Sequence, residues 1–291
     1  MIKYNEDKLV VVSVHGEISS PKIRDTPYRL GFDGVARVGA GTGGITYNVR
    51  VGDPAFGWAA DHVEPAVSSK HKDDMENGAY NFLSCIGNEA RIISGDGKGS
   101  TGVVVGKHGG VEHVMIDFAP EILDQLAIGD KILVKAVGQG MELSDFPGVR
   151  VMNLSPRLLE AMELDTSKEG KLRVPVSAMV PAVLMGSGLG SPTSERGDYD
   201  ITTQDKEFIR EQGLDTLKLG DLVAITDMSG DYGRSYQRGS LIIGVIIHGD
   251  SNIAGHGPGV TGLFSSNAGE IEPFVDKGAN LASLLKLRED F

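Results

Sequence analysis

Cysteine is nearly absent from this sequence, which has a single one, Cys85, among 291 residues. One cysteine cannot form a disulfide within the chain, and it cannot build a zinc site from several thiolates. Its neighbours in "FLSCIGNEA" are mostly apolar and include no adjacent base. We therefore expect Cys85 to be a buried, unreactive thiol, and we expect the protein to belong to the reducing cytoplasm.

Positive charge and long apolar runs are also scarce. The chain has 28 Lys and Arg against 40 Asp and Glu, a formal net charge of −12. Nucleic acids and anionic membranes are bound through basic patches, so we do not expect either as a partner. The longest apolar runs, such as "SLIIGVII", are too short to cross a bilayer, and residues 1–12 lack a signal-peptide pattern.

Motifs for nucleotide binding and for serine hydrolases are missing or incomplete. The spacing Gly39-x-Gly41-x-x-Gly44 matches a dinucleotide fingerprint, but the strand-like "ITYNVRV" follows it where that fingerprint needs a helix. The chain has no Gly-Lys-Ser/Thr P-loop and no Gly-x-Ser-x-Gly elbow. We therefore interpret residues 37–44 as a glycine turn and expect no nucleotide cofactor.

Glycine, by contrast, is abundant, with 40 residues spread along the chain, roughly twice the usual share. Glycines between short runs of β-branched residues predict many turns between short strands, for example at 9–14, 45–53 and 131–137. The predicted fold is mainly β (β-rich α+β), with two barrel-like halves and a few short helices. We place the domain boundary near residue 150, which gives domains 1–150 and 151–291.

Helical patterns occur in three places only. Residues 155–164 begin with Ser155 as the expected N-cap, and residues 202–213 begin near Thr203 and end at a glycine. A third helix is predicted at the C-terminal end, over 280–290.

One segment of the first half is echoed in the second. "LDQLAIGDKILV" (123–134) and "LDTLKLGDLVAI" (214–225) share a Gly-Asp turn that leads into a strand. The two halves are therefore predicted to be related β units. Because small barrels often hide their edges by association, we also expect a homo-oligomer.

"IISGDGKGSTGVVVG" (92–106) resembles the KOW motif of SH3-like barrels in ribosomal proteins and transcription factors. The resemblance implies a β-turn-β unit in a small barrel within the N-terminal domain. RNA contact in that family uses abundant basic neighbours, whereas Lys98 and Lys107 stand here beside Glu89 and Asp96. RNA association is thus the least favoured of the functions considered.

Two His-x-carboxylate pairs suggest a metal site. His62 and Glu64 lie two residues apart in "AADHVEPAVS", and His248 and Asp250 repeat this spacing in "IIHGDS". On an extended chain, residues two apart share a face, and His with carboxylate suits Zn, Mn or Fe. We predict that the two pairs could meet around a divalent ion. The alternative is that these side chains only cap turns.

Three further residues are candidates for catalysis. His256 in "GHGPG" could act as an acid and base, and the glycines around it would let a small substrate approach. Arg234 and Arg238, in a polar loop between two strands, could orient an anionic group through their planar forks. The alternative for the arginines is a solvated loop with weak ion pairs.

Two other segments have polar residues of interest. "GKHGGVEHVMIDF" (106–118) contains His108 and His113, which we interpret as surface histidines of a strand, with a pocket role for His108 as the alternative. The loop 185–200, "MGSGLGSPTSERGDYD", is long and rich in small residues, which is typical of functional or mobile loops.

The chain as a whole resembles a family of bacterial and archaeal proteins that has only a domain-of-unknown-function label. The resemblance rests on "CIGNEA", "GKHGG", "LAIGDKI", "GQG", "IHGDS" and "GHGPG". It implies a β-rich cytoplasmic protein, and it brings no activity or catalytic residue.

Whether the protein is an enzyme is therefore open from the sequence. The favoured hypothesis is a metal-dependent enzyme that hydrolyses an amide or ester of a small polar molecule. The ion would be held by His62, Glu64, His248 and Asp250, with His256 moving a proton and Arg234 or Arg238 orienting the substrate. The alternative is a non-catalytic oligomer that binds a small ligand or an anion.

Overall fold

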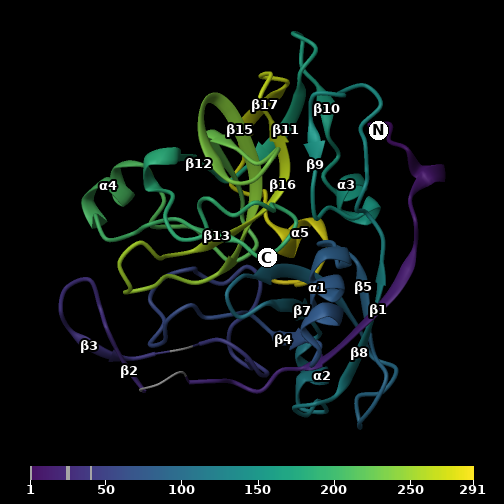
Figure 1. Ribbon diagram of the computed structural model, residues 1–291, viewed down its shortest axis with the longest axis vertical. Coiled ribbons are helices and arrows are strands. Elements are labelled where there is room, and N and C mark those ends of the chain that lie inside the picture. Colours follow the sequence, from purple (N-terminus) through teal and green to yellow (C-terminus); the bar gives the residue numbers. More distant parts are fainter. Residues whose placement is uncertain (1, 24–26, 40) are drawn as a thin grey trace.

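The structure, a computed structural model, describes residues 2–23, 27–39 and 41–291. It is built mostly of short strands with a few short helices, so the predicted β-rich fold is confirmed (Figure 1). The helices are η1 (Glu6–Lys8), α1 (Asp74–Leu83), α2 (Pro120–Leu123), α3 (Pro156–Ala161), η2 (Ala182–Leu184), α4 (Lys206–Glu211) and α5 (Leu281–Leu284). Within the described residues, no helix is long and apolar enough to cross a membrane.

The first half forms a closed barrel of six antiparallel strands in the order β1-β4-β7-β6-β5-β8. Alternating burial along β8 shows why the barrel closes, since Ile132, Val134 and Ala136 point inward while Lys131 and Lys135 are exposed. The KOW-like segment contributes the hairpin β5–β6 to this barrel. The strands are β1 (Val12–Ile18), β4 (Val67–Lys70), β5 (Glu89–Ile92), β6 (Thr101–His108), β7 (His113–Asp117) and β8 (Lys131–Ala136).

The second half forms open sheets. The largest has the order β12-β14-β15-β16-β13, with β9 also paired to β16. Its strands are β9 (Arg150–Val151), β12 (Ala178–Pro181), β13 (Tyr199–Asp200), β14 (Leu222–Ser229), β15 (Ser235–His248) and β16 (Gly259–Ser266). A three-stranded sheet contains β10 (Asp165–Thr166), β11 (Leu172–Val176) and β17 (Ile271–Val275). In the first half of the chain, a hairpin that is separate from the barrel contains β2 (Tyr28–Leu30) and β3 (Ala36–Val38).

The barrel and the large sheet share one hydrophobic core. Val105 and Met115 of the barrel belong to the same buried cluster as Ile243 and Ile247 of β15. Gly106 allows this contact, because a Cβ there would lie only 2.7 Å from the Cβ of Ile247. The packing therefore crosses the predicted boundary at 150, and the division into 1–150 and 151–291 stays a prediction.

Three of the expected elements differ from the structure. The C-terminal helix expected over 280–290 is only α5, which ends at Leu284. Residues 45–53 do not form a strand; Ile45 makes one bridge to Val67, and the chain then turns at Gly52, whose φ is 97°. The helix expected over 202–213 is only α4, and its N-cap is Asp205, whose carboxylate accepts from the Phe208 amide. Residues 45–53 alternate as a strand does, and residues 202–213 contain a suitable N-cap, but tertiary contacts decide whether such a local pattern forms the expected element.

The echoed segments do form the same turn. Asp130 accepts a hydrogen bond from the Ala127 amide at 2.8 Å, and Asp221 accepts one from the Lys218 amide at 2.8 Å. Each aspartate follows a glycine with a positive φ and precedes a strand. The echo is thus a shared way of entering a strand, in β8 and in β14.

Candidate metal centre

Four histidines and two aspartates from distant parts of the chain lie together where the barrel meets the large sheet. We call His62, His108, His248, His256, Asp198 and Asp200 the histidine–aspartate centre. The ring centroids of His108 and His248 are 4.3 Å apart, and that of His62 lies 4.9 Å from His248 and 5.1 Å from His256. His108 ends β6 and His248 ends β15, so both are fixed by strands.

The two His-x-carboxylate segments lie side by side through their backbones. The His62 amide donates to the Asp250 carbonyl at 3.1 Å, and the Gly249 amide donates to the Val63 carbonyl at 2.9 Å. His62 has a φ of 52°, a left-handed conformation that non-glycine residues seldom adopt. These contacts bring His62 to the end of β15, beside His248.

Three of the histidines donate a hydrogen bond from Nδ1 to a neighbouring oxygen atom. The acceptors are Asp61 Oδ2 for His62 at 2.7 Å, Glu64 Oε1 for His108 at 2.6 Å, and the Gly249 carbonyl for His248 at 2.9 Å. A neutral imidazole that donates through Nδ1 has a free lone pair on Nε2. This arrangement is typical of histidines that bind metals through Nε2, because the acceptor fixes both tautomer and ring orientation.

The Nε2 atoms of His62 and His248 point toward the carboxylates of Asp198 and Asp200. His248 Nε2 lies 2.9 Å from Asp198 Oδ2 and 3.7 Å from Asp200 Oδ1, and His62 Nε2 lies 3.6 Å from Asp200 Oδ2. Apart from this contact, His248 Nε2 and Asp198 Oδ2 are both buried without a hydrogen-bond partner. Two buried lone-pair atoms that face each other require a cation or a proton between them.

Two groups of three ligand atoms can be distinguished. His108, Asp198 and His248 are all buried, whereas His62, Asp200 and His256 include the partly exposed His256. Within each group, the nitrogen and oxygen atoms lie within 4.8 Å of one another. An ion about 2.0–2.2 Å from each ligand would need only small movements of these side chains.

The electrostatics of the centre are strongly coupled. Burial disfavours a charge on His248, but Asp198 and Asp200 outweigh it and hold its pKa well above the usual value. Burial likewise opposes ionisation of Asp200, yet His248, His256 and His62 lower its pKa. Asp200 is therefore ionised, and its carboxylate has the charge that a cation would need from a ligand.

The other carboxylates named in the sequence stand outside the centre. Glu64 is completely buried behind His108, and His113 also donates to it from Nδ1 at 3.0 Å. Asp250 accepts from the Ser251 amide and from Lys206 Nζ, and its side chain also pairs with Thr203. Of the four predicted ligands, the structure thus brings His62 and His248 together, with Glu64 as a support.

The three predicted catalytic residues have different surroundings. His256 lies in the centre, with Nδ1 2.8 Å from Asp200 Oδ2 and 3.1 Å from His62 Nε2. Arg234 is buried and donates to the backbone carbonyls of Arg196 and Asp198, so it holds the segment that leads into β13. Arg238 is exposed on β15.

Four residues in or near the centre were not among the predicted ligands, although a pocket role was the alternative for His108. His108 and His113 are only 6% and 5% exposed, so their interpretation as surface histidines is wrong. Their strands are buried on both faces, because α1 covers the outside of β7 and β15 packs on β6. Asp198 and Asp200 end the long loop 185–200, and their spacing of two residues in "DYD" was an available signal.

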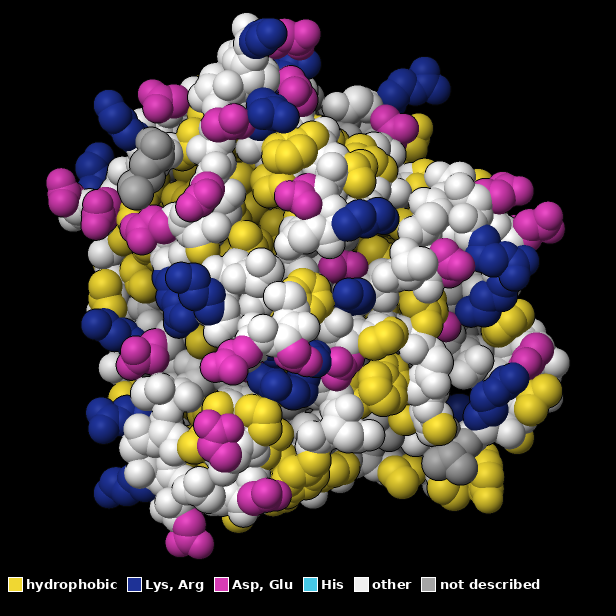
Figure 2. Space-filling model, turned by 180° about the vertical axis from the view of Figure 1, so that it is seen from behind, with side chains coloured by type: hydrophobic (Ala, Val, Ile, Leu, Met, Phe, Trp, Pro, Cys, Tyr) yellow, Lys and Arg dark blue, Asp and Glu magenta, His cyan; other side chains and the backbone are white. Residues whose placement is uncertain are grey.

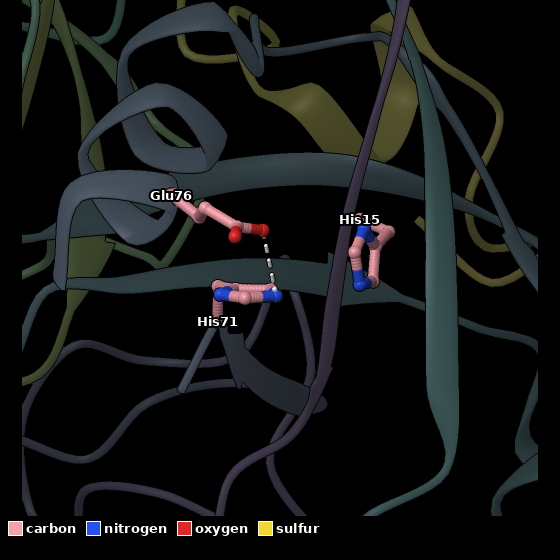
Figure 3. Close-up of side chains that lie close together, drawn as sticks. All are labelled: His15, His71 and Glu76. Atoms are coloured by element: carbon pink, nitrogen blue, oxygen red, sulfur yellow. Dashed lines mark ion pairs between the residues drawn. The ribbon is translucent and has the colours of Figure 1, made fainter. Parts of the chain in front are cut away.

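A separate group of potential ligands, His15, His71 and Glu76, lies at α1, outside the histidine–aspartate centre, and differs from it in the direction of its ring nitrogens (Figure 3). The Asp73 amide donates to His71 Nδ1, so the ring carries a proton on Nε2, which forms an ion pair with Glu76 Oε2 at 3.2 Å. His71 therefore has no free lone pair directed at the other two residues, unlike the histidines of the centre.

The comparisons with known proteins concern the whole chain. Two family models match it: the N-terminal domain of unknown function DUF4438 over residues 28–160, and the C-terminal domain of the same name over 161–285. A solved structure described as "Crystal structure of TM1086" is 47% identical, covers 97% of this chain and 98% of its own, and has a TM-score of 0.92. No curated protein matches the chain. The resemblance noted in the sequence is confirmed, and the chain belongs to the DUF4438 family.

Proposed function

We propose that this protein is a metal-dependent enzyme that hydrolyses an amide or ester bond of a small polar molecule. The observation that carries the proposal is the orientation of the histidines. Three of them donate from Nδ1 to an acceptor, and the Nε2 atoms of His62 and His248 face Asp200 and Asp198, where an ion could replace the proton that lies between them. An anion would be repelled by these carboxylates, so a divalent cation fits the centre better.

The ligand set favours Zn, Mn or Fe, which accept imidazole together with carboxylate. When bound, such an ion polarises a carbonyl oxygen and lowers the pKa of a coordinated water. The chain itself contributes ligand orientation: Asp61 and Glu64 fix two rings, and Arg234 holds the backbone of Asp198. The substrate would approach from the side of His256, whose side chain is 32% exposed.

Location and partners belong to the proposal as well. The buried free thiol of Cys85, whose pKa burial raises to about 11, fits a protein of the cytoplasm. Association into a homo-oligomer is also part of the proposal. RNA association stays the least favoured function, because acidic and basic side chains are interspersed on the face in Figure 2.

Elemental analysis by mass spectrometry tests the proposal on protein purified without a tag or a chelator. We expect near-stoichiometric Zn, Mn or Fe, which should be lost or greatly reduced in His62→Ala and His248→Ala and retained in the control His71→Ala. Metal-loaded protein should then hydrolyse members of a panel of small esters and amides.

Two outcomes would contradict this proposal. Metal-free protein, or metal that is indifferent to both substitutions, would leave non-catalytic ligand binding as the better function. Bound metal without hydrolysis of any panel member would keep the ion and remove the hydrolase.

A further inference from the structure

The carboxylate of Asp200 lies between the two groups of ligands. Its Oδ1 atom is 3.7 Å from His248 Nε2, while its Oδ2 atom is 2.8 Å from His256 Nδ1 and 3.6 Å from His62 Nε2. The two oxygens of one carboxylate thus face histidines of different groups. A carboxylate in this position can bind two neighbouring cations at once, one through each oxygen.

The centre also has more ligands than one ion needs. It presents four histidines and two aspartates, whereas a catalytic Zn²⁺ takes three protein ligands and keeps one position open. The inner group, His108, Asp198 and His248, and the outer group, His62, Asp200 and His256, each supply three ligands by themselves. This division matches the requirement of two ions rather than one.

The unpartnered atoms support an ion in the inner group. His248 Nε2 and Asp198 Oδ2 are buried, lie 2.9 Å apart and have no other hydrogen-bond partner, so either a proton or a cation lies between them. The second oxygen of Asp198 accepts from the Gly109 amide at 2.7 Å, which aims Oδ2 at His248. Gly259 keeps the adjacent space open, because a Cβ there would overlap both unpartnered atoms.

We propose that the centre is binuclear, with an inner ion on His108, Asp198 and His248, an outer ion on His62, Asp200 and His256, and Asp200 bridging the two. Two-metal hydrolytic sites hold their ions about 3.5–4 Å apart and use them to clamp an attacking and a leaving oxygen. The inference rests on the proposed metal site and adds its stoichiometry and the role of each ligand. It places His256 as a ligand of the outer ion.

The two ions should dissociate from the protein at different rates. All three inner ligands are buried, with His248 completely so, whereas the side chain of His256 is 32% exposed. Water and chelators reach the outer ion first. We therefore expect the outer ion to leave at least tenfold faster than the inner ion when the full-length protein is mixed with EDTA.

The test is the metal content per chain after reloading full-length protein with Mn²⁺, combined with electron paramagnetic resonance. We expect two Mn²⁺ per chain and a spin-coupled spectrum. His256→Ala should bind one ion and give an uncoupled spectrum, while His71→Ala should behave like the unchanged protein. Gly259→Ala should lose the inner ion, and Gly78→Ala, on the outer helix α1, is its matched control.

The outcomes separate the two proposals. One ion per chain in the unchanged protein would overturn the binuclear centre and leave the metal-dependent enzyme standing. Two ions that His256→Ala does not reduce, or that show no coupling, would also overturn it, because the second ion would then be bound elsewhere. No ion at all would overturn both proposals.

Discussion

At the scale of single residues, the most constrained group is the carboxylate of Glu64. It is completely buried, and it accepts from His108 and His113, from the Gly43 amide and from Ser68. Burial opposes its ionisation, but the two histidines hold its pKa well below the usual value. A buried carboxylate with this many donors is a fixed negative charge behind His108, and it makes that ring a stronger ligand.

Glu64→Gln should weaken metal binding while the fold is retained. The amide keeps the shape of the side chain, but it removes the charge and can accept fewer hydrogen bonds. Outer partners of metal-binding histidines typically contribute 10–100-fold in affinity, and we expect a loss of about that size. Competition with a fluorescent chelator measures it. Glu112→Gln, which alters only a partly exposed pair with Arg196, is the control, and equal affinities in both variants would contradict this role.

At the scale of elements, helix α4 shows how a local signal can be misassigned by two residues. Both Thr203 and Asp205 are good N-cap residues. Asp205 performs the capping, while Thr203 is buried and its hydroxyl donates to Asp250. The helix begins later than its pattern indicates because Thr203 is needed by a contact with the loop after β15.

Asp205→Ala should destabilise the protein by about 1 kcal/mol, the typical value of an N-cap. The carboxylate is exposed, so its loss removes the cap of the Phe208 amide and disturbs no core. Urea unfolding followed by circular dichroism measures the change. Asp215→Ala, a nearby exposed aspartate outside the helix, is the control and should change stability much less.

The same scale explains which parts of the centre could be predicted from the sequence. His62 and His248 each precede a carboxylate by two residues, and this spacing led to the prediction that they meet. The structure brings them together in another way, because His248 ends a strand whereas His62 lies in a bend with a left-handed φ. The spacing of Asp198 and Asp200 was a signal, but it did not show that they join the centre, because β13 is only two residues long and is defined by its pairing with β16. Strand pairing of this kind is non-local and leaves little periodicity in the sequence.

At the scale of the whole molecule, the β-rich class was predictable from glycine spacing and short apolar runs. Closure of the first half into a barrel was not fixed by any one strand, since it depends on β1 pairing with both β4 and β8. The burial of His108 and His113 depends on the same long-range packing, which is why it could not be predicted. The sequence therefore indicated which residue types could form a site, but it did not predict how deeply the surrounding strands bury them.

A charged cluster also ties the C-terminal segment to the barrel region. Arg288 donates to Asp53, Arg50 donates to the Leu287 carbonyl, and Asp117 of β7 lies 3.8 Å from Arg50. Burial raises the pKa of Asp117 to about 6, although Arg50 and Arg288 oppose the shift. The folded protein therefore binds a proton more tightly at Asp117 than the unfolded chain does.

This shift predicts a pH dependence. Because the folded pKa is raised, the stability that Asp117 contributes is present below about pH 4 and is lost as the pH rises through about 6. Asn resembles the protonated form, so the stability of Asp117→Asn relative to the unchanged protein should increase by roughly 2–3 kcal/mol between pH 4 and 7. Urea unfolding of chelator-treated protein at both pH values measures it. A relative stability that does not change with pH would contradict the shift.

The position of the histidine–aspartate centre has a consequence for the thermodynamics of the chain. His62 and His108 come from the segment matched by the N-terminal family model, and Asp198, Asp200, His248 and His256 come from the other. Neither segment holds a complete site, so an ion that binds there favours only the state in which both segments are docked. For each bound ion, a tenfold increase in free metal above the dissociation constant would then add about 1.4 kcal/mol to the free energy of unfolding. The metal supply of the cell would thereby set how firmly the two halves of this chain are joined.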